Sequence, residues 1–194
     1  MRSIILASTS KPRKKLLEQL KIPFQCVVPD VDETPLLHEE PAQLVQRLAK
    51  EKASIVAKKY PDSLIIGADQ VGLVDDTILS KPLTHDAAVA QLKKMSGKTI
   101  RFLVGLCLCD TANDTCQISL ESYDIVMRSL TNEMIEKYLQ KEDVLNCAGS
   151  FKLEGLGIAL IEQLRGDDYT MVIGLPLIRL IKMLEKAGVN VLAV

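Results

Sequence analysis

Basic side chains crowd the first turn of a helix that is predicted within residues 6–20. They are Lys11, Arg13, Lys14 and Lys15. The dipole of a helix favours acids at this end, and each exposed cation there costs about 0.3–1 kcal/mol. Free N–H groups at a helix start also bind phosphate, and nearby cations strengthen that binding. The cluster therefore indicates either a phosphate site or a solvated basic turn.

A cation also interrupts the apolar stripe of a second helix, predicted over residues 41–59. Leu44, Leu48 and Val56 repeat at the spacing of a core-facing surface, and Lys52 occupies the position missing from that repeat. A charged group among apolar side chains either reaches solvent through its long stem or meets an anion. Both outcomes remain open from the sequence.

A carboxylate follows an apolar run further along the chain. The segment 64–74 predicts a strand, a break at Gly67–Asp69 and then a second strand. Ligands collect at the carboxyl ends of strands in α/β sheets. Asp69 is therefore a candidate general base or metal ligand, and a turn-capping aspartate is the alternative. Gln70 follows it directly.

Two further charged positions have simpler competing explanations. Pro82 restricts Lys81 to an extended conformation, so the lysine side chain has a defined exit direction. Glu33 lies in an acidic loop with Asp30 and Asp32. Such a loop is suited to holding a hard divalent cation through oxygen ligands, although a solvated acidic loop is the more common explanation.

These residues are set in a chain where strands and helices alternate. Strands are expected at 3–8, 24–29, 64–74, 77–80, 101–110, 117–130 and 157–164. Helices are expected within 6–20 and at 41–59, 84–95, 131–141 and 176–188. Because two pairs of strands are joined as hairpins, we predict an α/β protein with a mixed sheet. The length favours a single domain over 1–194, with or without two lobes.

Composition excludes some classes of function. The chain has 24 basic and 25 acidic residues, a net charge of −1 and a pI near 6.2, which argues against a nucleic-acid-binding face. No apolar run approaches the roughly 20 residues of a membrane span, so we expect a cytoplasmic protein with no membrane partner. The five cysteines contain no CxxC pair and are expected to be reduced and mostly buried. They are Cys26, Cys107, Cys109, Cys116 and Cys147.

The chain resembles the Maf-like nucleoside triphosphate pyrophosphatases nearly from end to end. The motifs are LASTS…R…LL at 6–17, DVDET at 30–34, EKA at 51–53, IIGADQV at 65–71, SKPL at 80–83, CAGSFKLEG at 147–155 and GLPL at 174–177. The resemblance implies an elongated α/β fold with a mixed sheet and a cleft between two lobes. It implies hydrolysis of a nucleoside triphosphate between the α and β phosphates with a divalent cation, Mg²⁺ or Mn²⁺. A homodimer is also implied.

The resemblance assigns roles to individual residues. Asp69 matches the general base, and Glu33 matches an acidic position that we assign to the metal together with Asp69. The positions that match phosphate contacts are Ser8, Arg13, Lys52 and Lys81. Gln70 and Glu154 match positions that separate substrate branches, and their surroundings are most similar to the branch that acts on 7-methyl-GTP.

The opening motif departs from the family pattern at Lys11 and Pro12. That branch often has an aromatic residue at position 12, which attracts a cationic purine by about 0.5–2 kcal/mol. Pro12 cannot supply this attraction, although the charge of Glu154 still favours a cationic base. The alternatives are the same reaction on dTTP, UTP or CTP, or a non-catalytic nucleotide-binding regulator of cell division.

Overall fold

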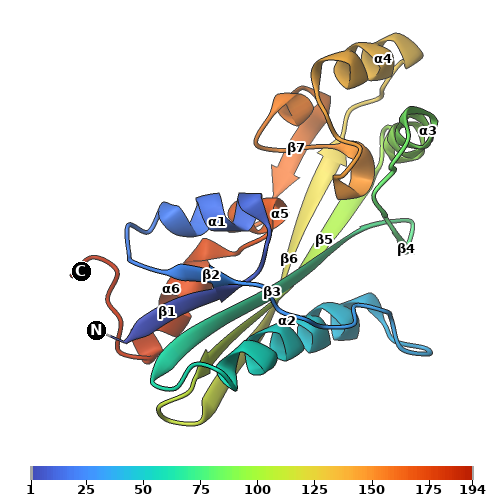
Figure 1. Ribbon diagram of the computed structural model, residues 1–194. Helices are drawn as coiled ribbons and strands as arrows, with labels where there is room; N and C mark the ends of the chain where they lie inside the picture. The colour runs from blue at the N-terminus through green and yellow to red at the C-terminus, as the bar shows by residue number, and fades with distance from the viewer. Residues whose placement is uncertain (1, 194) are drawn as a thin grey trace. The chain divides into compact units, whose positions relative to one another are not determined.

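The computed structural model describes residues 2–193 as an α/β protein built on a seven-stranded sheet (Figure 1). The strands are β1 (Ser3–Ala7), β2 (Gln25–Val27), β3 (Ser63–Val74), β4 (Thr77–Ile78), β5 (Thr99–Asp110), β6 (Thr115–Met127) and β7 (Ile161–Arg165). The α-helices are α1 (Lys11–Glu18), α2 (Pro41–Ala57), α3 (His85–Met95), α4 (Asn132–Lys141), α5 (Thr170–Ile173) and α6 (Leu177–Lys186). Two 3₁₀ helices are η1 (Ala148–Ser150) and η2 (Leu156–Leu160).

The sheet is mixed, as the sequence predicts. Its strand order is β2-β1-β3-β5-β6-β7, and β4 pairs with β3 outside this path. Strand β1 runs parallel to both β2 and β3, whereas β3 and β4 are antiparallel, as are β6 and β7. Within residues 2–193, none of the helices combines the length and the apolar character needed to cross a bilayer.

The chain divides into two compact units, each with its own contacts. Unit 1 comprises residues 1–70, 103–121 and 174–194, and unit 2 comprises 71–102 and 122–173. Strands β3, β5 and β6 each contribute residues to both units. The expected cleft between two lobes stays a prediction.

In unit 1, helix α2 lies against one face of the sheet at two glycines. A Cβ atom on Gly67 of β3 would lie 2.2 Å from the carbonyl oxygen of Ala49. A Cβ atom on Gly105 of β5 would lie 2.0 Å from the carbonyl oxygen of Val45. Backbone atoms cannot move aside as a flexible side chain can, so glycine at these two positions permits the close approach of the helix.

Helix α6 packs on the opposite face of the sheet. The side-chain amide of Gln117 in β6 donates to the carbonyl oxygen of Met183 in α6 at 2.9 Å. The neighbouring residue Cys116 points to the α2 side, because successive residues of a strand face opposite ways. Unit 1 is therefore a sheet covered by helices on both faces.

Unit 2 has its own packing, centred on α3, α4 and the irregular segment around η1. The rings of Phe102 and Phe151 lie 6.0 Å apart. Gln91 of α3 donates to the carbonyl oxygen of Ser80 at 2.8 Å and accepts from the hydroxyl of Ser150 at 2.6 Å. Gln91 thus connects the segment that follows β4 to the segment at η1 through two hydrogen bonds.

Several predicted boundaries are confirmed. Ser10, Thr84 and Thr131 cap α1, α3 and α4 with their side-chain oxygens. Gly97 and Gly188 adopt the positive φ of helix-ending glycines, at 69° and 82°.

The predictions for the segments 64–74 and 157–164 are wrong. The break at Gly67–Asp69 is absent, because β3 continues without interruption from Ser63 to Val74. Asp69 therefore lies inside a strand and not at its end. The strand predicted at 157–164 begins at Ile161, since Leu156–Leu160 forms the 3₁₀ helix η2.

The prediction that the cysteines are reduced and mostly buried is also wrong. Cys109 and Cys116 form a disulfide across the turn between β5 and β6. Cys26 and Cys116 are exposed, while Cys107 and Cys109 are buried. An odd cysteine count does not reveal which strands will lie side by side.

We predict that Gly105→Ala lowers the free energy of unfolding by about 1–3 kcal/mol, because the new methyl group overlaps backbone atoms of α2. Urea unfolding would measure this change. Gly72→Ala is the matched control in a strand, since its Cβ would meet a side chain, the ring of Phe102 at 3.1 Å, and not the backbone. Equal losses for both variants would contradict the close backbone contact.

Candidate active site

Lys52 forms the centre of a charged cluster in unit 1. Its Nζ atom lies 2.6 Å from Oδ1 of Asp69 and 2.7 Å from Oε1 of Glu33. Lys52 is only 5% exposed, so its ammonium group meets anions and does not reach through to solvent. The cation that interrupts the apolar stripe of α2 is therefore an ion-paired residue.

Helix α2 and strand β3 together position this pair. Gly67 and Asp69 are two residues apart in β3, so both face α2. The close approach of α2 at Gly67 brings the helix within reach of the Asp69 carboxylate. The glycine therefore sets the distance across which Lys52 and Asp69 pair.

Burial raises the pKa of Asp69 above its ordinary value, because the protein interior disfavours the charged carboxylate. The positive charges of Lys52 and Arg13 act in the opposite direction, and the negative charge of Glu33 raises the pKa further. Asp69 thus has the chemistry of a proton acceptor that is stronger than a solvent-exposed aspartate.

Arg13 of α1 belongs to the same electrostatic cluster. Burial lowers the pKa of its guanidinium, and the charges of Asp69 and Glu33 oppose that shift. Its Nε atom donates to the carbonyl oxygen of Gly174 at 2.8 Å, which fixes the side chain. Gly174 leaves room for this arrangement, since a Cβ there would lie 3.4 Å from the side-chain oxygen of Gln70. Arg13 and Gln70 are therefore neighbours in unit 1.

The loop before α1 supplies a buried hydroxyl and a helix start. Ser8 is 7% exposed, and its Oγ accepts from the backbone N–H of Ser10 at 3.1 Å. Ser10 in turn accepts from the N–H of Arg13 at 3.4 Å, while Pro12 occupies the first turn and lacks a donor. The hydroxyl of Ser8 and the start of α1 thus lie in one short segment with Arg13.

Arg47 is a positioning residue that the sequence analysis missed. Its guanidinium makes two hydrogen bonds with the carboxylate of Glu39, at 2.6 and 2.8 Å, and a third with the carbonyl oxygen of Thr34 at 3.1 Å. It therefore holds the loop that carries Glu33 against α2. Hydrogen bonding to Arg47 lowers the pKa of Glu39 to about 2, so the pair stays ionised at neutral pH. The i, i+4 spacing of Arg47 and Glu51 was the only signal in the sequence.

Lys81 and Glu154 belong to unit 2, and both are exposed. Their two segments lie side by side there. The N–H of Leu83 donates to the carbonyl oxygen of Leu145 at 3.0 Å, and the N–H of Gly149 donates to that of Ser80 at 3.3 Å. Unit 2 therefore brings SKPL and CAGSFKLEG together, while the roles of Lys81 and Glu154 stay predictions.

Two carboxylates of the cluster suit a magnesium-type cation. Mg²⁺ is commonly held by one or two carboxylates together with substrate phosphates and water. Glu33 and Asp69 offer such a pair, since both lie on one ammonium group. Across residues 2–193, the acidic loop gathers no group of three carboxylates, and Asp32 instead accepts from the N–H of Thr34 at 2.9 Å.

Comparison with known proteins gives a family match and two similar relatives that extend over nearly the whole chain. The model of the Maf-like protein family matches residues 3–187. A 7-methyl-GTP pyrophosphatase of Nitrosococcus oceani is 48% identical over 190 residues, covering 98% of this chain and 96% of that protein. A 7-methyl-GTP pyrophosphatase of Colwellia psychrerythraea is also 48% identical, over 193 residues that cover 100% of this chain and 96% of that protein. Among solved structures, the Ham1 protein of Staphylococcus aureus overlaps 66% of this chain and 73% of its own, with 12% identity and a TM-score of 0.42.

We predict that two substitutions move the pKa of Asp69 in opposite directions. Lys52→Met should raise it, because an attractive positive charge is lost, and Glu33→Gln should lower it, because a repulsive negative charge is lost. Carbon-detected NMR titration of the Asp69 carboxyl, in protein treated with a chelator, would measure both. Shifts of the same sign would contradict the cluster. Glu18→Gln is the control, because Glu18 pairs with Lys14 and is not among the charges that shift the pKa of Asp69.

Proposed function

The chain belongs to the Maf-like protein family, and on that basis we propose that it is a pyrophosphatase that hydrolyses 7-methyl-GTP to 7-methyl-GMP and pyrophosphate. The names of two relatives at 48% identity support the substrate. The observation that carries the proposal is the ionic cluster of Lys52, Asp69 and Glu33 beside Arg13. Cations for phosphate oxygens and a carboxylate with a raised pKa are the groups that such a hydrolysis needs.

In this mechanism Asp69 acts as the general base. It accepts a proton from a water molecule that attacks the α phosphorus in line with the departing pyrophosphate. The raised pKa of Asp69 favours this proton transfer. Lys52 turns from the carboxylates to the leaving phosphates, where Lys81 is proposed to assist.

The start of the chain binds the rest of the triphosphate. Arg13 has a planar guanidinium suited to two phosphate oxygens, and its bond to Gly174 pre-orients it. The hydroxyl of Ser8 and the N–H groups at the start of α1 add further donors.

Glu33 and Asp69 are the residues that would hold a divalent cation, Mg²⁺ or Mn²⁺. When bound, such a cation neutralises phosphate charge. Arg47 keeps Glu33 in position through the loop residues Thr34 and Glu39.

The nucleobase of the substrate is proposed to contact Gln70 and Glu154. A negative Glu154 favours the positively charged 7-methylguanine over neutral bases. Pro12 supplies no aromatic face, so the same reaction on dTTP, UTP or CTP is the second candidate. A cytoplasmic location, a homodimer and the lack of a nucleic-acid partner belong to the proposal and stay predictions.

We expect pyrophosphate release from 7-methyl-GTP to exceed release from GTP, dTTP, UTP and CTP when each is assayed with Mg²⁺. Asp69→Asn should lower the rate by about 10²–10⁴-fold, the usual worth of a general base. A preference for another nucleobase would assign the protein to a different substrate branch of the family, with the same mechanism. If no nucleotide is cleaved with Mg²⁺ or with Mn²⁺, the proposed pyrophosphatase activity is refuted and the non-catalytic regulator is favoured.

The roles of Glu33 and Asp69 are separable by metal titration. Glu33→Gln should raise the Mg²⁺ concentration needed for half-maximal rate, and excess metal should restore part of the activity. Asp69→Asn should stay inactive at every metal concentration because the base itself is lost. Equal rescue of both variants would argue that Asp69 acts only through the metal.

A further inference from the structure

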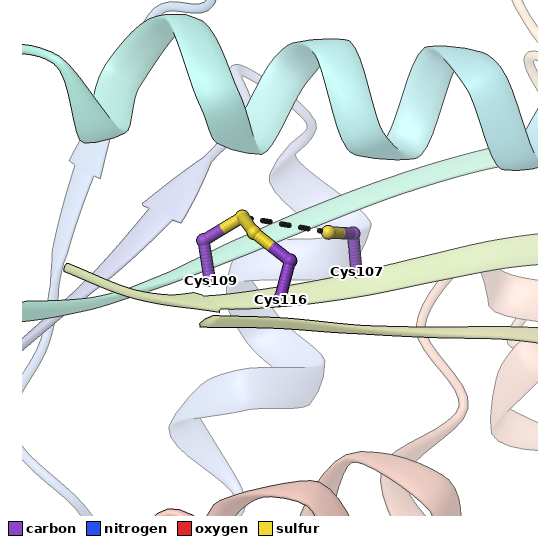
Figure 2. A group of neighbouring side chains, drawn as sticks. All are labelled: Cys107, Cys109 and Cys116. Atoms are coloured by element: carbon purple, nitrogen blue, oxygen red, sulfur yellow. Dashed lines mark hydrogen bonds between the residues drawn. A yellow bond between two sulfur atoms is a disulfide. The ribbon is translucent and has the colours of Figure 1, made fainter. Parts of the chain in front are cut away.

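Three sulfur atoms gather on the face of the sheet that α2 covers, outside the active-site cluster (Figure 2). Strand β5 supplies Cys107 and Cys109, and β6 supplies Cys116. The three Sγ atoms lie within 4.8 Å of one another. Cys109 and Cys116 are joined as a disulfide, and the Sγ of Cys107 lies 3.7 Å from that of Cys109. Nothing in the proposed hydrolysis uses them.

Accessibility differs sharply among the three residues. Cys107 is 0% and Cys109 is 3% exposed, whereas Cys116 is an exposed residue. A thiol reagent in solution therefore reaches this group through Cys116. Cys109 then meets the reagent only after Cys116 has reacted.

We propose that Cys109 and Cys116 form a redox-active dithiol that exchanges with small-molecule disulfides of the glutathione class. The Cys116 thiolate attacks one sulfur of the small disulfide, which forms a mixed disulfide and releases one thiolate. The Cys109 thiolate then attacks the Cys116 sulfur, forms the internal disulfide and releases the second thiolate. Two protein thiols are oxidised, one small disulfide is reduced to two thiols, and an excess of the small thiol reverses both steps.

The backbone supports repeated opening and closing of this bond. The Cα atoms of Cys109 and Cys116 lie 4.1 Å apart, close to the roughly 4.5 Å of directly opposed residues in a non-hydrogen-bonded strand pair. The turn at residues 111–114 joins β5 and β6 as a hairpin, so strand pairing holds the two side chains together in either redox state.

Cys107 is excluded from the exchange by its surroundings. It packs with Ala49 and Ala53 of α2, and burial raises the pKa of its thiol to about 11. It also lies on the same strand as Cys109, two residues away, whereas Cys116 lies on the neighbouring strand β6 with its Cα atom 4.1 Å from that of Cys109. Its closeness to Cys109 therefore does not make it the partner that forms the bond.

The test is a titration of the full chain. Reduced protein would be equilibrated at a series of ratios of reduced to oxidised glutathione, and free thiols would then be alkylated and mapped by mass spectrometry. We expect a reversible transition in which Cys109 and Cys116 lose their free thiols together. Cys109→Ser should instead accumulate a glutathione adduct on Cys116, and Cys116→Ser should lose the internal disulfide and leave Cys109 unmodified. Cys107→Ala is the matched control and should behave as the wild type.

Three results would overturn the proposal. The first is a bond from Cys107 to either neighbour, and the second is an adduct that appears on Cys109 first. The third is reduced protein that retains a stoichiometric soft cation, Zn²⁺ or Cu⁺, through all three sulfurs and resists oxidation until a chelator removes it. Circular dichroism would confirm that each variant is folded. Because thiol state is the readout, the result is independent of nucleotide hydrolysis.

Discussion

A buried ammonium group is the constraint on which the rest of unit 1 depends. Placing Lys52 on the apolar side of α2 removes its charge from water, and this is tolerable only beside anions. Asp69 must therefore face α2 from inside β3, and Glu33 must reach the same point from a loop. The glycine at position 67 follows from this need, because any side chain there would separate helix from strand.

The loop partner of Lys52 needs its own anchor. Glu33 has an exposed side chain, so a single bond to Lys52 holds it weakly. Arg47, which lies earlier on α2 by about 1.4 turns, binds the same loop through Glu39 and Thr34. Helix α2 thus supplies both Lys52, which pairs with the loop carboxylate of Glu33, and Arg47, which holds the loop against the helix. Lys52 pairs with Glu33, and Arg47 binds both the neighbouring Thr34 and the more distant Glu39.

Sequence patterns predicted the elements better than the contacts between them. Helix caps such as Thr84 are local signals, and the structure confirms them. Lys52 on an apolar helix face predicted either an ammonium group that reaches solvent or one that meets an anion. The identity of that anion, Asp69, depends on the packing of α2 against β3. Arg47 was missed because its main partner lies eight residues away in a loop with no periodic pattern. The Cys109–Cys116 bond was missed because it depends on strand register.

The balance of charge in the cluster gives a physical reason for the divalent cation in the proposed reaction. Arg13 and Lys52 offset Asp69 and Glu33, so the free site is internally neutral. In the proposed reaction, a triphosphate would compete for Arg13 and Lys52 and would leave Glu33 and Asp69 uncompensated, next to further negative charge. A divalent cation held by Glu33 and Asp69 would offset this repulsion. The same exchange would release Asp69 from Lys52, which would leave this carboxylate available for its proposed role as general base.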